Sequence, residues 1–378
     1  MNEKVRFAFS GDDMFRQALR EREPIPGSVG FVFSGQGLSS REVLYKYADA
    51  LSRIDKAVVS RNIALMENAT KLPLSRYIES RDESVLGGTH VVQAMVHGLH
   101  LAAIQLLEPH LSEKKNIHIT AGHSAGEMAA MVAAGVLTPE DSVRLVAIRG
   151  AEMHKVALES NTGLILPFGF DWKKAIGVGT DTTELIKTLK KMSLDDIINN
   201  ERYRAIFEIV ADAQQISVTD LREILNADHF VALALANEPT VNVLGGTKPA
   251  LAFAWEMAKR NGARLIKDVD AEGAFHTPAM QKAANVLDKA FEKTRFRSPR
   301  FLMVSNTGVA TSSADEIGKM HIASMTKTAQ WATAMERGFG NIENVVKIGP
   351  DRKMPGVSEA NGIPKDRQTE IIDFLTAS

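Results

Sequence analysis

The residues with the clearest chemical potential lie in Gly122-His123-Ser124-Ala125-Gly126, which matches the pattern Gly-x-Ser-x-Gly. A serine on a tight turn between a strand and a helix projects its hydroxyl clear of the sheet, and the flanking glycines let the backbone approach closely. The N-terminus of the following helix points amide groups at the place where an oxyanion would form. Small residues also crowd purely structural turns. Here, however, an apolar segment at 116–121 precedes the turn and a helical one at 127–134 follows it, so we interpret Ser124 as a nucleophile.

A serine nucleophile needs a base, and the chain has ten histidines. His276 is the best candidate, because its loop follows a predicted strand at 263–269 and loop side chains are free to face a cleft. Three other histidines lie on a helix predicted over 89–108, where packing or solvent exposure explains them. His123 points to the other side of the turn and supports it. No acid stands out as a third member.

Composition is typical of an ordinary soluble globular protein. The 378 residues are 44% hydrophobic and 24% charged, with a net charge of −1, so no basic field recruits nucleic acid. The absence of cysteine excludes disulfide scaffolds, thiolate metal sites and a cysteine nucleophile. No apolar run reaches the about 18 residues of a membrane span. The polar start of the chain has no signal-peptide core. We therefore expect a cytoplasmic protein with neither a membrane nor a nucleic acid as partner.

Strands and helices alternate in the first half of the chain, which predicts an α/β fold with a mostly parallel sheet. Residues 1–28 are interpreted as an N-terminal extension, ending in the turn-rich Pro24-Ile25-Pro26-Gly27, before a strand at 29–33. Thr138-Pro139-Glu140-Asp141 predicts a helix start with Thr138 as the N-cap. The other expected elements of this half are helices at 42–67 and 89–108 and a strand at 116–121.

The middle of the chain differs in composition and predicts a second unit. Strand-like segments at 163–170 and 230–244 flank a region rich in Lys, Asp, Glu and Thr, and a helix at 249–261 and a strand at 263–269 follow. We expect a small ferredoxin-like α+β subdomain over 163–272, with an insertion of two or three helices around 172–226. The large domain, α/β-hydrolase-like, then comprises 29–162 and 273–378, with a last strand at 345–348.

The chain resembles the malonyl-CoA:acyl carrier protein transacylase family, which includes the acyltransferase domains of polyketide and polyunsaturated fatty acid synthases. The matching motifs follow the family order over about residues 29–360. They are Phe33-Ser34-Gly35-Gln36-Gly37, Thr89-x-x-x-Gln93, Gly122-His123-Ser124-Ala125-Gly126-Glu127, Ala134-Gly135-Val136-Leu137, Arg149-Gly150, Asn237-Glu238-Pro239, Gly273-Ala274-Phe275-His276, Ser305-Asn306-Thr307-Gly308, Gln330-Trp331 and Ile348-Gly349-Pro350.

The resemblance implies a catalytic role for five residues. Ser124 would be the nucleophile and His276 its general base. The backbone carbonyl of Gln330 would orient the imidazole, which accounts for the missing acid. The amides of Gln36 and Ala125 would form the oxyanion hole.

The resemblance also implies a substrate pocket. Arg149 would bind the malonyl carboxylate through two parallel N–H···O hydrogen bonds. Gln93 would help to position the same region, and Asn237 would contact substrate or shape its loop. Phe275 stands where a bulky ring leaves less room for an α-methyl branch, which favours malonyl over methylmalonyl.

Three departures from the family pattern weaken the inference about the substrate. Ala125 stands where a larger side chain is frequent. Glu272 adds an acid near the cleft, which would disfavour an acidic acyl group. The third departure is the 172–226 insertion, for which the sequence suggests no function.

The implied reaction is a ping-pong acyl transfer by a monomer. A malonyl or related acyl group would pass from coenzyme A to Ser124, and then to the phosphopantetheine thiol of an acyl carrier protein. Coenzyme A enters as a thioester substrate, and neither a metal nor a bound cofactor is required. Two alternatives remain open: a thioesterase or acyl hydrolase on the same scaffold, and a non-catalytic docking module.

Overall fold

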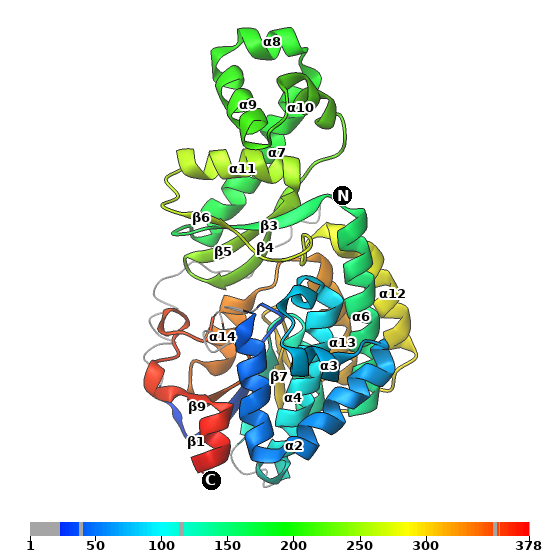
Figure 1. Cartoon of the computed structure of the whole chain (residues 1–378). Coiled ribbons are helices and arrows are strands. Elements are labelled where there is room, and N and C mark those ends of the chain that lie inside the picture. The colour runs from blue at the N-terminus through cyan, green and yellow to red at the C-terminus, as the bar shows by residue number, and fades with distance from the viewer. Residues whose placement is uncertain (1–22, 38–40, 113–116, 351–353, 355, 378) are drawn as a thin grey trace.

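A six-stranded sheet forms the centre of the large lobe in the computed structural model, which describes residues 23–37, 41–112, 117–350, 354 and 356–377 (Figure 1). All neighbouring strands are parallel except β7 and β8, which pair antiparallel. In spatial order the strands are β10 (Gln368–Glu370), β9 (Ile342–Ile348), β1 (Ile25–Phe33), β2 (Ile117–Gly122), β7 (Leu302–Val304) and β8 (Ala310–Thr311). The predicted mostly parallel α/β architecture is confirmed.

Strand β1 begins earlier than the sequence indicated. Ile25 already pairs with Ile342, and the register then shifts before Val29. Gly27 takes up this irregularity with a positive φ of 74°, a conformation that glycine adopts without steric cost. Residues 25–28 are therefore an irregular part of the strand, and the expectation that the N-terminal extension runs to residue 28 is wrong. Residues 1–22 lie outside the described residues.

Alternating side chains of β1 face two different cores. Phe31 and Phe33 belong to the main apolar core, whereas Val32 belongs to a second one that includes Trp331. A strand buried on both faces needs a helical layer on each side. The helices that contribute to the main core are α2 (Glu42–Thr70), α3 (Leu74–Ser80), α4 (Thr89–Ser112), α5 (Gly126–Ala133), α6 (Pro139–Glu159), α12 (Gln281–Glu292), α13 (Ala314–Thr326) and α15 (Ile371–Ala377), and α14 (Trp331–Phe339) contributes to the second.

Two of these helices bear on the expectations from sequence. Thr138 caps α6, since its hydroxyl accepts a hydrogen bond from Asp141 N at 3.1 Å. Helix α4 is the one described helix whose length and apolar composition would suffice for a membrane span, over Thr89–Pro109. That window is 83% buried inside the protein, so α4 is a core helix. Short 3₁₀ turns occur at Glu83–Gly87, Pro278–Met280, Glu359–Asn361 and Lys365–Arg367.

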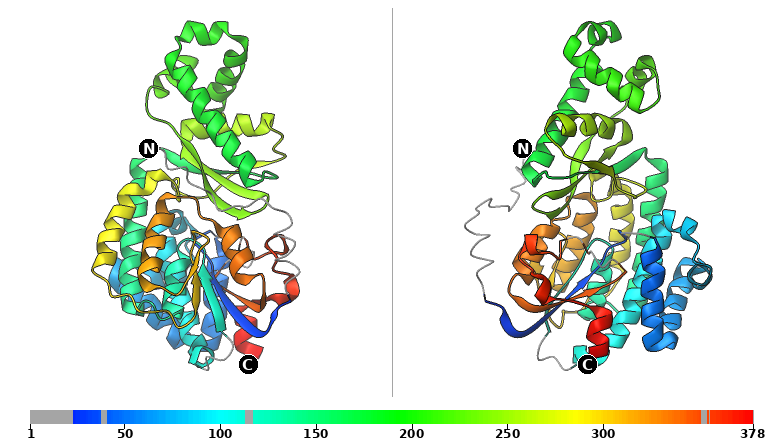
Figure 2. Two further views of the ribbon diagram at one scale, coloured as in Figure 1. Left: turned by 180° about the vertical axis from the view of Figure 1, so that it is seen from behind. Right: turned by 60° about the vertical axis from the view of Figure 1, so that its left-hand side comes forward.

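The second lobe contains a four-stranded antiparallel sheet (Figures 1 and 2). Its strands are β3 (Thr162–Pro167), β4 (Val231–Glu238), β5 (Val241–Thr247) and β6 (Ile266–Asp268), and α11 (Lys248–Arg260) connects β5 to β6. The spatial order of the strands is β4-β5-β3-β6. Along the chain, helices follow the first strand, β3, and the third strand, β5. This is the ferredoxin-like arrangement that we expected. The segment at 230–244, expected as one strand, is instead part of a β4–β5 hairpin. The domain boundaries at 163 and 272 remain a proposal.

The insertion forms four helices rather than two or three. They are α7 (Trp172–Lys191), α8 (Leu194–Asn199), α9 (Glu201–Ala213) and α10 (Val218–Ile224), and α8–α10 lie at the far end of the small lobe in Figure 1. Phe207 of α9 packs against Phe253 of α11 with ring centroids 6.3 Å apart. The insertion therefore shares the apolar core of the small lobe.

Candidate active site

Ser124 lies on a strained turn between the end of β2 and the start of α5. Its backbone φ is 50°, in the left-handed region, which a residue with a Cβ adopts only where its surroundings enforce it. A Cβ on Gly122 would lie 2.1 Å from the backbone carbon of Gly126, and one on Gly126 would lie 2.4 Å from Ser34 O. Both glycines are therefore sterically required, and the predicted elbow is present.

His276 reaches Ser124 from a loop 152 residues further along the chain. Its Nε2 lies 2.7 Å from Ser124 Oγ, and its Nδ1 donates to the backbone carbonyl of Ser324 at 2.7 Å. With the ring proton held on Nδ1, Nε2 is free to accept the proton of the serine hydroxyl. His276 also has a left-handed φ, of 59°. Ser124 and His276 thus both occupy strained backbone.

The expectation that Gln330 orients the imidazole is wrong. The Gln330 carbonyl accepts the N–H of Ala334 at 2.9 Å, which is the first hydrogen bond of α14. Ser324 lies in the last turn of α13, where helix carbonyls lack intrahelical donors and remain available. Gln330 is still near, because it lines a cavity of about 440 Å³ together with His276.

Burial keeps His276 in its neutral form. The pKa of His276 is lowered to about 3, chiefly by desolvation and next by the positive charge of Arg149, while the hydrogen bond to Ser324 acts in the opposite direction. A neutral imidazole at physiological pH is the state that a general base requires.

Arg149 lies beside Ser124 and is almost fully buried. Its Nη2 donates to Ser124 Oγ at 3.3 Å and its Nη1 to Gln93 Oε1 at 2.5 Å. Gln93 is itself held by Thr89, whose hydroxyl accepts from Gln93 Nε2 at 3.0 Å. The pKa of Arg149 is lowered to about 10, because burial lowers it more than nearby Glu127 raises it, so the guanidinium stays charged at neutral pH. The structure thus brings together Ser124, His276, Arg149 and Gln93, as the sequence predicted.

The two proposed oxyanion donors flank the same turn. Ala125 precedes the first residue of α5. Gln36 follows Gly35, where an added Cβ would lie 3.0 Å from His123 O, and Gln36 Oε1 accepts from the Thr89 hydroxyl at 2.6 Å. Their role as donors stays a prediction.

Asn237 and Phe275 lie near the turn in supporting positions. Asn237 Oδ1 accepts from His123 Nε2 at 3.1 Å, and the His123 ring packs edge-on against Trp331 with centroids 5.0 Å apart. His123 therefore braces the turn, as expected. Phe275 is 5% exposed and belongs to the main core, and its effect on substrate choice stays a prediction.

Glu272 is engaged by neighbouring groups rather than free. Its Oε2 accepts from the backbone N–H of Thr89 at 2.7 Å and from His154 Nδ1 at 2.9 Å. The carboxylate thus lies at the N-terminus of α4, where the helix dipole favours a negative charge. The effect of this acid on an acidic acyl group stays a prediction.

Sequence reasoning assigned no role to Asn306, Glu127 and His321, which lie directly beneath the turn. Asn306 Oδ1 accepts from Ser124 N at 2.9 Å. Glu127 Oε2 accepts from Asn306 Nδ2 at 2.8 Å and from His321 Nδ1 at 2.7 Å. Asn306 and Glu127 both stand in motifs shared with the family, which was the available signal.

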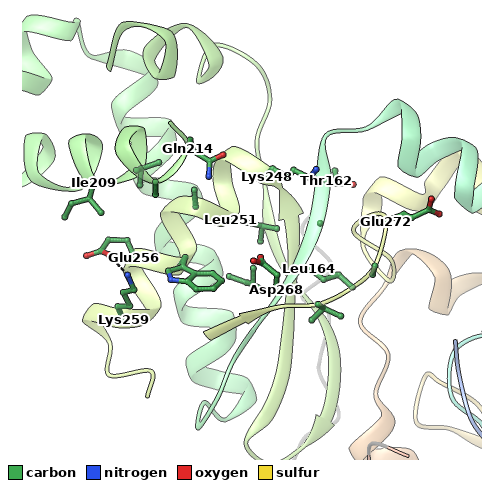
Figure 3. A pocket seen from close by; sticks show the side chains of 18 residues that line it. Thr162, Leu164, Ile209, Gln214, Lys248, Leu251, Glu256, Lys259, Asp268 and Glu272 are labelled. Carbon is green, nitrogen blue, oxygen red and sulfur yellow. Dashed lines mark ion pairs between the residues drawn. The ribbon is translucent and has the colours of Figure 1, made fainter. Parts of the chain in front are cut away.

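Another cavity lies away from the catalytic groups. It has a volume of about 560 Å³ between α9, α11 and the small sheet, and its walls include Ile209, Leu251 and Trp255 (Figure 3). Neither Ser124 nor His276 lines it. Among the described residues, no group of three His, Asp or Glu side chains could hold a metal ion.

Acyltransferases are among the known proteins with a similar sequence. The family model described as "Acyl transferase domain" matches residues 30–169. Malonyl CoA-acyl carrier protein transacylase of Bacillus subtilis is 24% identical over 336 residues, covering 87% of this chain and 89% of that protein. The enzyme of the same name from Mycolicibacterium smegmatis is 28% identical over 313 residues, covering 78% of this chain and 91% of that protein.

Solved structures agree on the fold. The malonyl-CoA:acyl carrier protein transacylase of Xanthomonas oryzae pv. oryzae has a TM-score of 0.71 at 21% identity, covering 93% of this chain and 97% of that one. A malonyl-transacylase in complex with a type II polyketide synthase acyl carrier protein has a TM-score of 0.68 at 20% identity, covering 93% of this chain and all of that one. The chain is thus similar in sequence to acyl transferase domains over residues 30–169 and to malonyl CoA-acyl carrier protein transacylases over most of its length, and it shares the fold of the solved transacylases.

Proposed function

We propose that the protein transfers a malonyl or closely related acyl group from coenzyme A to an acyl carrier protein through an ester on Ser124. The observation that supports the proposal is that the side chains of His276 and Arg149 both contact the hydroxyl oxygen of Ser124. Ser124 Oγ has a neutral imidazole at 2.7 Å and a buried guanidinium at 3.3 Å. The imidazole suits activation of the hydroxyl, and the guanidinium suits an acyl group that ends in a carboxylate.

In the first half-reaction, His276 Nε2 takes the proton of Ser124 as Oγ attacks the thioester carbonyl. The amides of Gln36 and Ala125 would hold the oxyanion, with each such donor worth about 3 kcal/mol at the transition state. The C–S bond breaks, and coenzyme A leaves as a thiol after receiving the proton from His276. The product is an acyl ester on Ser124.

The second half-reaction runs the same steps in reverse. The phosphopantetheine thiol of the carrier protein gives its proton to His276 and attacks the ester, and Ser124 recovers its proton as the acyl group leaves. The names of the similar proteins support this choice of donor and acceptor. Arg149 would hold the malonyl carboxylate during both steps, with Gln93 fixing the plane of the guanidinium.

Several finer points remain our proposals. Asn237 would shape the substrate loop, and Phe275 would limit branching at the α-carbon. The protein would act as a monomer in the cytoplasm, with the coenzyme A thioester as substrate and no resident cofactor.

Incubation with radiolabelled malonyl-CoA tests the proposal. We expect a label on the wild-type protein that is stable to gel filtration, absent from Ser124→Ala and discharged by a phosphopantetheinylated carrier protein. Rapid release of free malonate without a stable label would identify a hydrolase. No label and no malonate would leave a docking module and contradict an enzymatic function.

A further inference from the structure

The carboxylate of Glu127 is buried beneath the nucleophile turn. Glu127 is 0% exposed. Its Oε1 accepts from Asn306 N at 3.1 Å, and its Oε2 accepts from Asn306 Nδ2 at 2.8 Å and His321 Nδ1 at 2.7 Å. Burying a carboxylate is costly unless donors satisfy it. Three donors from two separate segments of the chain do so here, and these two segments lead to the nucleophile and to the base.

One segment leads through Asn306 to Ser124. A carboxylate only accepts hydrogen bonds, so it forces the amide nitrogen of Asn306 towards itself. The amide oxygen then faces Ser124 N, which donates to it at 2.9 Å, and Nδ2 also donates to Gly122 O at 2.9 Å. Asn306 thus holds both ends of the strained turn, and Glu127 fixes which way its amide points.

The other segment leads through His321 to His276. His321 lies on α13, three residues before Ser324. The carbonyl of Ser324 accepts the hydrogen bond from His276 Nδ1. Ser324 Oγ donates to the carbonyl of His321 at 2.8 Å, and the His321 ring stacks on Phe291 with centroids 5.7 Å apart. His321 Nε2 has no hydrogen-bond partner among the described residues, so the link to Glu127 is the polar anchor of this ring.

We propose that Glu127 is a positioning residue that keeps Ser124 Oγ within hydrogen-bonding distance of His276 Nε2. It touches neither the reacting atoms nor the imidazole, because the Nδ1 of His276 is already bonded to Ser324. It acts instead by fixing the backbone of Ser124 from one side and the helix that carries the Ser324 carbonyl from the other. The contact between Ser124 and His276 therefore depends on Glu127, although Glu127 is not part of that contact.

The proposal rests on the proposed function only in taking Ser124 and His276 as the reacting pair, and its test avoids coenzyme A. The readout is the rate at which a fluorophosphonate probe labels Ser124, since this reaction needs the activated hydroxyl but no malonyl group. If the wild-type protein reacts with the probe but not with malonyl-CoA, the proposed function fails and the role of Glu127 can still be measured.

Glu127→Gln keeps the size of the side chain but replaces one accepting oxygen with a donor. We expect its labelling rate to fall by about tenfold or more, as for the loss of one hydrogen bond to a charged group, with the half-saturating probe concentration unchanged. The matched control is Thr182→Val, which removes a buried hydrogen bond to Val178 O in the distant α7 and should lose stability without losing rate. A labelling rate of folded Glu127→Gln within about twofold of wild type would overturn the proposal.

A second pair of variants covers the case in which Glu127→Gln does not fold. His321→Asn retains a donor near the position of Nδ1, whereas His321→Leu has none. We expect His321→Asn to keep most of the labelling rate and the low-field proton resonance of His276 Nδ1, and His321→Leu to lose both. Equal rates in the two folded variants would overturn the proposal.

Discussion

Arg149 Nη2 lies 3.3 Å from Ser124 Oγ, the same oxygen that His276 Nε2 approaches at 2.7 Å. A buried cation therefore contacts Ser124 Oγ and acts electrostatically on His276. It lowers the pKa of His276 and favours negative charge on the serine oxygen. When an acid-tailed acyl group binds, its carboxylate offsets this cation. The electrostatics of the site thus differ between a malonyl and a neutral acyl substrate.

Arg149→Ala should separate these two kinds of substrate. Loss of a charged hydrogen-bond pair costs about 1.5–3 kcal/mol, so we expect the rate of malonyl loading to fall about 10- to 100-fold. Acetyl loading makes no use of the carboxylate pair and should fall less than malonyl loading does. Single-turnover labelling with radioactive malonyl-CoA and acetyl-CoA measures both rates.

Arg149→Lys is the control, because lysine keeps the positive charge but lacks the planar guanidinium group. It should load malonyl at an intermediate rate, because an ammonium group cannot make two parallel bonds to a carboxylate. If Arg149→Ala slowed malonyl and acetyl loading equally, the arginine would support the fold of the site and would not recognise the carboxylate.

The pH dependence of acylation should reflect the lowered pKa of His276, which is about 3. The neutral imidazole is the proposed base, so the activity of the folded protein persists as the pH falls below about 6.5 and is lost as the pH approaches the pKa of His276 in the folded state. We expect the acid limb of kcat/KM to lie well below about pH 6.5, the value for an unperturbed histidine. Stopped-flow measurement of fluorophosphonate labelling at decreasing pH tests this.

Arg149→Gln should shift that acid limb. The arginine's positive charge contributes to the low pKa of His276, so its removal should move the limb to higher pH. A wild-type limb near pH 6.5, or an unchanged limb in Arg149→Gln, would contradict this electrostatic account.

The sequence predicted local features well because their signals are local. The glycines of the Ser124 turn, the Thr138 cap and the ferredoxin-like order of elements all have patterns within short segments. Ser324 could not be predicted in the same way, since its backbone carbonyl is the functional group and any residue carries one. Gln330 was chosen from its motif, but its carbonyl already begins α14.

Contacts between distant segments were the second kind of information that the sequence lacked. Glu127 and His321 are 194 residues apart, and neither has a spacing that indicates the other. The β4–β5 hairpin was missed for a local reason. Only Pro239 and Thr240 separate its strands, and no Asn-Gly or Gly-Gly pair marks the turn.

Two glycine substitutions should have opposite effects on stability. In Gly122→Ala the new Cβ would lie 2.1 Å from backbone of Gly126, and backbone cannot yield as a flexible side chain does. We expect a loss of about 3 kcal/mol or more in the free energy of unfolding, together with loss of Ser124 labelling. Urea denaturation followed by circular dichroism measures the first effect.

Gly177→Ala is the matched control within α7. Its Cβ would meet nothing within 4 Å, and alanine is favoured over glycine in a helix by about 1 kcal/mol. We expect a gain in stability of about that size with unchanged labelling. A stable, active Gly122→Ala protein would refute the steric requirement at the turn.

Buried histidines should make the fold sensitive to mild acid. Burial is the largest cause that lowers the pKa of His97 and His100 to about 3 and that of His123 to about 4. In the unfolded chain these groups titrate near about 6.5, so the unfolded state binds more protons as the pH falls below that value. Stability is therefore complete above about pH 6.5 and declines below it, by up to about 1.4 kcal/mol per pH unit for each histidine.

Urea midpoints at about pH 6.5 and about pH 5 isolate this effect, because carboxylates titrate mainly below that window. His97→Gln provides the control. It removes one titrating group while offering an amide to Ser142, the present partner of His97 Nε2 at 2.9 Å. The variant should lose less stability than wild type between the two pH values. Equal stability of the wild-type protein at both pH values would contradict the lowered pKa values of the buried histidines.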